Sequence, residues 1–193
     1  ASSSERGATQ VKQVFLVGAG TGSREVLMVI HRINQRTPEW QFVGFVDENP
    51  KLVGTKIDGY PVFGPAHPFQ GKDYYGSSGV QNPEIRQRLI RQYVLERDCG
   101  LATLISPDVF LPGDFSAGPG CVIMPGATIS FDVRLAEGVM VQWGAILGHE
   151  LRVGDYSSIL TAALITGGCR IGSRTIIGAG AVLNVRVDVG DDA

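Results

Sequence analysis

The sequence has little excess charge, few cysteines and no long apolar run. Lys and Arg together number 17 against 19 Asp and Glu, so the formal net charge is -2. This balance excludes a general electrostatic attraction to nucleic acid or to an anionic membrane. No apolar stretch approaches the roughly 20 residues that a membrane-spanning helix needs, so we expect no membrane span. Residues 1–12 lack the apolar core of a signal peptide and are expected to form a disordered leader.

The cysteines do not have the spacing of metal ligands. Cys99, Cys121 and Cys169 are widely separated along the chain, and no metal site is expected. We interpret them as structural thiols in a reducing compartment, the cytoplasm. The sequence is rich instead in glycine, with 26 residues, and in hydrophobic residues, at 44%. This composition is typical of a globular protein with many turns.

An aliphatic residue returns at every sixth position from Ile105 to the end of the sequence. Of the fifteen positions in this series, fourteen are Ile, Leu or Val, and the other is Ala117. A second, mostly small or apolar residue follows most of them four positions later. This period fits neither an α-helix nor an ordinary strand, and it is typical of a parallel β-helix with three hexads in each coil. We predict this β-helix over residues 105–193.

The N-terminal part of the chain predicts a different unit. An apolar strand at residues 13–17 ends in the turn Gly18-Ala-Gly-Thr-Gly-Ser23, a helix follows, and Asp47 closes a second apolar strand. This order opens a nucleotide-binding fold, in which a helix N-terminus can bind phosphate. We therefore expect a Rossmann-like α/β domain over residues 13–104. The match is incomplete, because Ser23 stands where a dinucleotide fingerprint has Gly or Ala. The alternative is that the glycines only make a tight turn and Asp47 only ends a strand.

Two further features of this domain are interpreted as solvent-exposed. Asn82 and Pro83 predict the start of a second helix. We expect Ile85, Leu89 and Tyr93 on the apolar face of this helix, and its arginines, Arg86 among them, on or near the opposite, solvated face. The alternative is that these arginines help to hold a phosphate-bearing substrate. His67 is expected in a solvated loop.

His149 stands out from the β-helix turns because it is the only histidine in the repeat and is followed by Glu150. An imidazole with the ordinary histidine pKa of about 6.5 is largely neutral at pH 7 and can accept a proton from an amine or hydroxyl. A carboxylate on its other ring nitrogen would fix the tautomer and raise its basicity. Neighbouring strand residues point to opposite faces, so the pair can cooperate only at a corner of the coil. Gly167, one coil later, would leave room above His149 for a ligand. The alternative is a solvated turn histidine.

Five motifs occur in a particular order along the chain. They are Val17-Gly-Ala-Gly20, Ser23-Arg-Glu-Val26, Gly44-Phe-Val-Asp47, Gly59-Tyr-Pro-Val-Phe-Gly64 and, within the hexapeptide array, Gly148-His-Glu150. This order resembles the bacterial sialic acid O-acetyltransferase family, which also contains N-acetyltransferases of nucleotide-linked 4-amino sugars. The resemblance implies a left-handed β-helix, a homotrimer, acetyl-CoA as donor and active sites in the clefts between subunits.

The resemblance also implies roles for individual residues. It assigns His149 as general base and Glu150 as the group that increases its basicity. It places donor contacts near Ser158 and around Ala179, and we add Gly167 to the donor site because of its spacing from His149. The nucleotide-sugar contacts that it implies are Gly20, Thr21, Gly22, Asp47, Glu48 and Gly79.

The sequence departs from the family pattern at three places. Gly22 stands where the family often has a histidine, and Ser158 replaces a second histidine. Family members usually continue for about another coil beyond Ala193, so part of the donor site is expected to be incomplete.

We therefore predict an enzyme that transfers an acetyl group from acetyl-CoA to an amine or hydroxyl of a nucleotide-activated sugar, for surface glycan synthesis. One alternative is a sialic acid O-acetyltransferase, and another is a non-catalytic trimeric scaffold. A third alternative, a Rossmann-type oxidoreductase, would explain the glycine turn but would not account for the β-helix.

Overall fold

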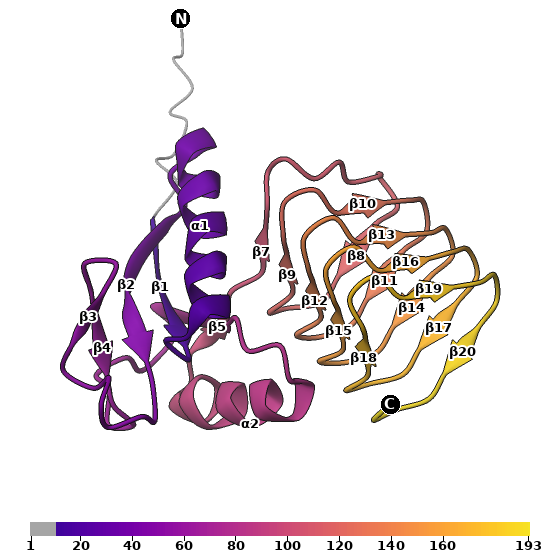
Figure 1. Ribbon diagram of the computed structural model, residues 1–193. Coiled ribbons are helices and arrows are strands. Elements are labelled where there is room, and N and C mark those ends of the chain that lie inside the picture. Colours follow the sequence, from indigo (N-terminus) through magenta and orange to yellow (C-terminus); the bar gives the residue numbers. More distant parts are fainter. Residues whose placement is uncertain (1–10) are drawn as a thin grey trace, which may run out of the picture.

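The computed structural model describes residues 11–193 (Figure 1). Most of the expected leader, residues 1–10, lies outside the described residues, and Lys12 already belongs to the first strand. The described chain forms an α/β domain followed by a parallel β-helix, which confirms the predicted fold class. Neither helix of this part of the chain is both long and apolar enough to cross a membrane.

The α/β domain is built on a six-stranded sheet in the order β3-β4-β2-β1-β5-β6. All neighbouring strands are parallel except β3 and β4, which form the short hairpin. A parallel sheet is buried on both faces, and the apolar residues 14–17 of a central strand are accordingly almost inaccessible to solvent. The elements are β1 (Lys12–Val17), α1 (Thr21–Arg36), β2 (Trp40–Val46), β3 (Lys56–Ile57), β4 (Tyr60–Phe63), β5 (Tyr74–Ser78), α2 (Pro83–Tyr93), a 3-10 turn (Leu95–Arg97) and β6 (Gly100–Leu101).

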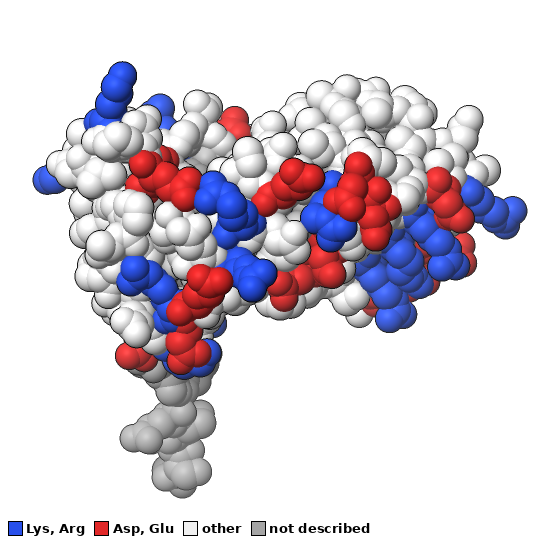
Figure 2. All heavy atoms as spheres, turned by 90° about the horizontal axis from the view of Figure 1, so that it is seen from below, with Lys and Arg blue, Asp and Glu red and all other residues white. Residues whose placement is uncertain are grey.

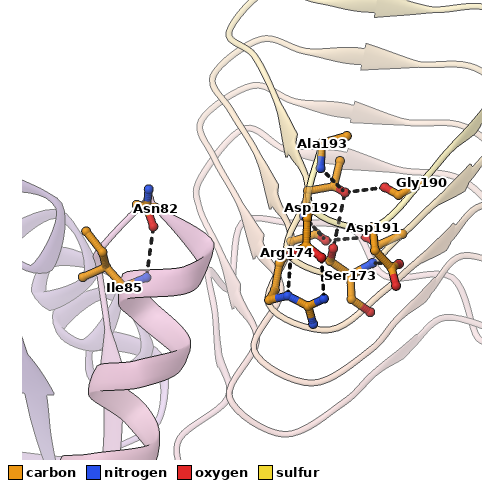
Figure 3. Close-up of polar contacts among 11 residues, drawn as sticks. Asn82, Ile85, Ser173, Arg174, Gly190, Asp191, Asp192 and Ala193 are labelled. Atoms are coloured by element: carbon orange, nitrogen blue, oxygen red, sulfur yellow. Dashed lines mark hydrogen bonds and ion pairs between the residues drawn. The ribbon is translucent and has the colours of Figure 1, made fainter.

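Helix α2 begins where the sequence predicts, and the predicted apolar residues Leu89 and Tyr93 are buried, but two positions of the helix differ from the prediction. The Asn82 side chain accepts a hydrogen bond from the Ile85 amide at 3.0 Å, which caps the helix (Figure 3). Ile85 is 45% exposed, whereas Arg86 is only 3% exposed. The prediction of a solvated Arg86 is therefore wrong. Hydrophobicity alone could not show that this side of the helix lies against backbone carbonyl groups of the β-helix, which bind the guanidinium.

His67 is also buried, contrary to the prediction of a solvated loop residue. Its side chain packs among the rings of Phe15, Phe69 and Tyr93, and the residue is 3% exposed. Neither ring nitrogen has a hydrogen-bond partner among the described residues. Burial, followed by the nearby Arg97, lowers the pKa of His67 to about 4. The imidazole therefore acts as part of the apolar core at neutral pH.

This burial predicts an acid-sensitive fold. In the unfolded chain a histidine has a pKa of about 6.5, so below this pH the unfolded state binds a proton that the folded state excludes until about pH 4. The free energy of unfolding should therefore fall by up to roughly 3 kcal/mol between these pH values. Urea unfolding at pH 7.5 and pH 4.5 measures the difference. His67→Leu should reduce it, whereas replacement of the exposed His31 should not; equal pH dependence in both variants would contradict the assignment.

The second part of the chain is a left-handed β-helix of two-residue strands on three sheets. Partner strands are 18 residues apart, as in the pair Thr128 and Ile146, so three hexads make one coil as predicted. The first sheet contains β7 (Leu104–Ile105), β9 (Val122–Ile123), β12 (Met140–Val141), β15 (Ser158–Ile159) and β18 (Ile176–Ile177). The second contains β8 (Ser116–Ala117), β11 (Arg134–Leu135), β14 (Arg152–Val153), β17 (Arg170–Ile171) and β20 (Asp188–Val189). The third contains β10 (Thr128–Ile129), β13 (Ile146–Leu147), β16 (Leu164–Ile165) and β19 (Val182–Leu183).

The hexad residues form the core of the β-helix. Ile123, Ile159 and Ile165 are completely buried, and the cysteines of the repeat, Cys121 and Cys169, are inward-facing free thiols in the same cluster. Each large aliphatic side chain removed from water contributes about 1.5–3 kcal/mol before the entropic cost of folding is counted. Because these side chains contact their equivalents one coil away, the repeat is stable only as a stack.

Side chains at the corners connect successive coils. In the last coils the Asp191 carboxylate accepts a hydrogen bond from the Ser173 amide at 2.7 Å. Arg174 donates to both carboxylate oxygens of Asp192 at 2.6 and 2.7 Å (Figure 3). Both pairs join positions 18 residues apart, so the same corner is reinforced from one coil to the next.

The α/β domain lies on the face of the β-helix formed by the β7 sheet (Figure 1). Outward-facing residues of this sheet, Leu104, Val122 and Met140, are buried in the same cluster as Val14 and Leu16 of the domain. The two parts therefore share an apolar interface. The other two faces of the β-helix point away from the domain.

Candidate functional site

His149 and Glu150 lie in the turn between β13 and β14, at a corner of the coil. Glu150 has a φ of 55°, the left-handed conformation that also occurs one coil later at Gly168. This conformation turns the chain sharply and lets both side chains point outward. Nδ1 of His149 lies 2.9 Å from Oε2 of Glu150, and the side chains are 47% and 60% exposed. The pair therefore lies at a corner of the coil, where the two side chains can cooperate.

The His149 ring has a defined neighbour on each side along the β-helix axis. One coil earlier, the ring of Phe131 stacks on the imidazole with 5.0 Å between centroids and 8° between planes. One coil later, a Cβ atom at Gly167 would lie only 2.3 Å from Nε2 of His149. The absence of a side chain at Gly167 is therefore a requirement for the observed position of the ring. The sequence predicted room at this glycine but did not identify Phe131, which has the same offset of 18 residues in the other direction.

The hydrogen bond to Glu150 has a consequence for the imidazole. When Nδ1 carries the proton and donates it to the carboxylate, the lone pair on Nε2 is free to accept another proton. Nε2 lies on the side of the ring next to Gly167. The arrangement can therefore act as an oriented general base at an open corner.

The two faces that meet at this corner differ in chemistry. On the β10 sheet, Ile146 and Val182 point outward and are 44% and 66% exposed. On the β8 sheet, Arg134, Arg152 and Arg170 are in register one above the other. Figure 2 shows Lys and Arg gathered on the β-helix at the end away from the α/β domain. His149 thus lies on an edge between an apolar face and a face with a row of arginines, two of which form ion pairs with Asp132.

The glycine turn of the α/β domain forms a second candidate site. A shallow pocket of about 370 Å³ opens at the N-terminus of α1. Gly22 and Gly79 touch there, because a Cβ atom at Gly22 would lie 2.2 Å from the Gly79 carbonyl oxygen. No side chain caps the first turn of α1, so its amide groups face this pocket without a capping acceptor from the described residues. The pocket is lined by Gly20, Thr21, Gly22, Ser23, Gly79, Val80 and Gln81.

The two acidic residues expected near the nucleotide do not line this pocket, and both have partners within the domain. Asp47 accepts hydrogen bonds from the amides of Ala19 at 2.7 Å and Asn49 at 2.8 Å, so it shapes the glycine turn. Glu48 forms a two-pronged ion pair with Arg88 at 2.8 and 2.9 Å. The Arg88 hydrogen bonds hold the pKa of Glu48 below its ordinary value. A structural role of this kind for Asp47 is the alternative to ligand contact that the sequence leaves open.

The three expected donor residues are not in one place. Gly167 lies at the corner next to His149, whereas Ala179 lies exposed at the corner between the β7 and β10 sheets. Ser158 is completely buried in β15, facing the α/β domain. Its hydroxyl donates to the Gln81 carbonyl oxygen at 2.7 Å and accepts from Arg86 at 2.9 Å. Within residues 11–193, no three His, Cys, Asp or Glu side chains are grouped as metal ligands.

The His149 corner and the glycine pocket of the same chain lie on different sides of the β-helix. The domain that carries the pocket covers the β7 sheet. His149 lies at the edge between the other two sheets, opposite that covered face (Figure 1). A single chain therefore separates the two candidate sites by the width of the β-helix.

Comparison with known proteins connects these features. The PglD N-terminal domain family matches residues 13–93. This part of the chain is therefore similar to PglD N-terminal domains. The match agrees with the family expected from the order of sequence motifs. No curated protein matches the chain in sequence.

Solved structures share the fold of this chain, an α/β domain followed by a β-helix. The acetyltransferase domain of PglB from Neisseria gonorrhoeae, also solved with acetyl coenzyme A, is 23% identical with a TM-score of 0.81, over 93% of this chain and 86% of that chain. PerB from Caulobacter crescentus, solved with CoA and GDP-perosamine, is 20% identical with a TM-score of 0.74, over 96% and 94%. WeeI from Acinetobacter baumannii is 19% identical with a TM-score of 0.65, over 94% and 95%. At these identities the likeness establishes the shared fold.

Proposed function

We propose that this protein transfers an acetyl group from acetyl-CoA to an amine of a nucleotide-linked sugar, or to a hydroxyl of such a sugar. The observation that carries the proposal is the His149–Glu150 pair, whose free ring nitrogen lies against Gly167 at an open corner of the β-helix. Support comes from the neighbours that share the fold, because one is solved with acetyl-CoA and another with CoA and a GDP-linked sugar.

The chemistry follows from the orientation of the imidazole. The acceptor nitrogen or oxygen attacks the thioester carbonyl carbon, and Nε2 of His149 takes the proton that the acceptor loses. The new bond to carbon replaces the carbon–sulfur bond, and the proton passes to the departing thiolate. Glu150 stabilises the imidazolium while it carries the charge. An amine acceptor must be in its neutral form to attack.

We place the nucleotide of the acceptor in the pocket at the N-terminus of α1. Gly20, Thr21 and Gly22 would offer backbone amides to a phosphate group, and Gly79 closes the opposite side. The fit rests on the uncapped first turn of the helix and on the close contact of two glycines, which keeps side chains out of the pocket. Asp47 binds the Ala19 amide of the glycine turn, and Asp47 and Glu48 would position this turn or contact the nucleoside.

We further propose a homotrimer in which the acceptor pocket of one subunit faces the His149 corner of another. The separation of the two sites within one chain supports this, since one subunit cannot bring them together. The exposed Ile146 and Val182 side chains give the β10 face the apolar character of a subunit interface. Acetyl-CoA would then lie between subunits, against Gly167 of one and the backbone near Ala179 of the next. We assign the reaction to the cytoplasm, in keeping with three free, buried cysteines.

A thiol-release assay tests the function. The protein is incubated with acetyl-CoA and, separately, with UDP-, GDP- and dTDP-linked amino sugars and free sialic acid. We expect release of free CoA with at least one nucleotide-linked amino sugar, and release at least about a hundredfold slower with the same sugar in the His149→Ala variant. Release with sialic acid alone would favour the O-acetyltransferase alternative. No thiol release with any sugar of the panel, together with no binding of acetyl-CoA, would favour the non-catalytic scaffold.

A further inference from the structure

Arg86 is a buried cation whose bonding partners are all uncharged. The guanidinium donates to the carbonyl oxygens of Gly138 at 3.2 Å and of Ser157 at 3.2 Å, and also to that of Tyr156, all on the β-helix. Burial lowers the pKa of Arg86 to about 10, which reflects the cost of removing the charge from water. A buried charge held only by neutral groups is expensive, so this arrangement needs a reason beyond packing.

The same guanidinium also binds the loop that lines the acceptor pocket. Nη1 of Arg86 donates to the carbonyl oxygens of Val80 at 2.7 Å and Gln81 at 3.1 Å, and to the Ser158 hydroxyl at 2.9 Å. The Ser158 hydroxyl in turn donates to the Gln81 carbonyl at 2.7 Å. Val80 and Gln81 form one wall of the pocket at the N-terminus of α1. One network therefore joins a pocket wall to three successive β-helix residues, 156–158.

We propose that Arg86 and Ser158 are positioning residues for the acceptor pocket, fixing its Val80–Gln81 wall to the β-helix. This inference rests on the proposed function, and it takes Ser158 away from the donor site that the family resemblance implies. The Ser158 hydroxyl has both a donor and an acceptor partner within the network and is completely buried. Its effect on the reaction therefore passes through the loop at Gln81.

Ser157 provides a matched control. It is adjacent to Ser158 and equally buried, but its hydroxyl donates to the Gly172 carbonyl at 2.6 Å and accepts from the Thr175 amide at 3.0 Å. These contacts lie wholly within the β-helix. Ser157→Ala thus removes a buried hydroxyl and two hydrogen bonds without touching the pocket wall.

Amide hydrogen exchange of the free protein tests the positioning role without any substrate. Ser158→Ala should increase exchange in peptides covering residues 79–82, and leave the corner at His149 unchanged. Ser157→Ala should leave residues 79–82 as in the wild type. Arg86→Lys should increase exchange at residues 79–82 more strongly than Ser158→Ala does. If Arg86→Lys fails to fold, the comparison of Ser158→Ala with Ser157→Ala still tests the proposal. Unchanged exchange at residues 79–82 in Ser158→Ala would overturn the proposal.

Steady-state kinetics with the acceptor that gives thiol release then assign the site. Loss of the two buried hydrogen bonds of the Ser158 hydroxyl should raise the KM for the acceptor about fivefold in Ser158→Ala, with the KM for acetyl-CoA within twofold of wild type. A raised KM for acetyl-CoA with an unchanged acceptor KM would return Ser158 to the donor site and overturn the inference. If no acceptor gives thiol release, the proposed function fails, while hydrogen exchange at residues 79–82 still tests whether Ser158 positions the pocket wall.

Discussion

Replacing His149 by alanine should lower the turnover of acetyl transfer by roughly two to four orders of magnitude, the usual contribution of a general base. The structure supports a value in this range because the ring is already oriented, with Nδ1 on Glu150 and a face on Phe131. Single-turnover measurements with saturating acetyl-CoA and acceptor would isolate the chemical step. Near-wild-type turnover in a folded His149→Ala protein would exclude the mechanism.

Two controls separate chemistry from structure in that experiment. His149 is half-exposed at a turn, so its removal should change the free energy of unfolding by no more than about 0.5 kcal/mol. Glu150→Gln keeps a side chain of the same size and an acceptor oxygen but removes the charge that stabilises the imidazolium. It should therefore reduce turnover less than His149→Ala does, and a larger loss would point to a direct role of the carboxylate.

The fold was predictable because its strongest determinant is a short-range pattern. An aliphatic residue at every sixth position can be buried only if the chain turns after each short strand, and Ile159 and Ile165 are indeed completely buried. The same spacing placed Gly167 one coil above His149, where the structure has it. A strict period converts position along the chain into position in space. For this reason, part of the site at the His149 corner could be inferred without a structure.

The features that the sequence did not reveal depend on contacts between the two parts of the chain or within the domain core. Arg86 and His67 were assigned to solvent because their side chains are polar, and both are 3% exposed. Arg86 is buried because β-helix carbonyl groups complete its hydrogen bonding, and no local pattern on α2 records their position. His67 is buried because the rings of Phe15 in β1 and Tyr93 in α2 pack on it together with that of the neighbouring Phe69. Burial of polar side chains requires knowledge of the partner, which periodicity does not supply.

Replacing Gly167 by alanine should lower turnover about a hundredfold while leaving the fold intact. The added Cβ atom would lie 2.3 Å from Nε2 and 2.4 Å from Cε1 of His149. Phe131 blocks retreat on the other side, so the ring must rotate away from Glu150. Displacement of a catalytic group by about 1 Å can cost on the order of 10²-fold. Turnover, thermal stability and the KM for acetyl-CoA are the quantities to measure.

A matched glycine shows whether the effect is local. Gly113 occupies the equivalent position of the same corner, 18 residues before Phe131, and a Cβ atom there would meet nothing within 4 Å. Gly113→Ala should therefore leave turnover unchanged. Equal losses in both variants would indicate a general effect of alanine at this corner and contradict the specific contact with His149.

The predictions for His149→Ala and Gly167→Ala can be tested together, because the two residues are in contact. If Gly167→Ala acts only by displacing the imidazole, it should have almost no further effect on turnover in a protein that already carries His149→Ala, since residues that act as a unit are not additive. Removing the ring also removes the atom that the new Cβ would meet. If Gly167 instead contacts the donor directly, the double variant should bind acetyl-CoA more weakly than His149→Ala alone. The affinity of the double variant for acetyl-CoA, measured by calorimetry, therefore distinguishes a glycine that makes room for the base from one that also holds the substrate.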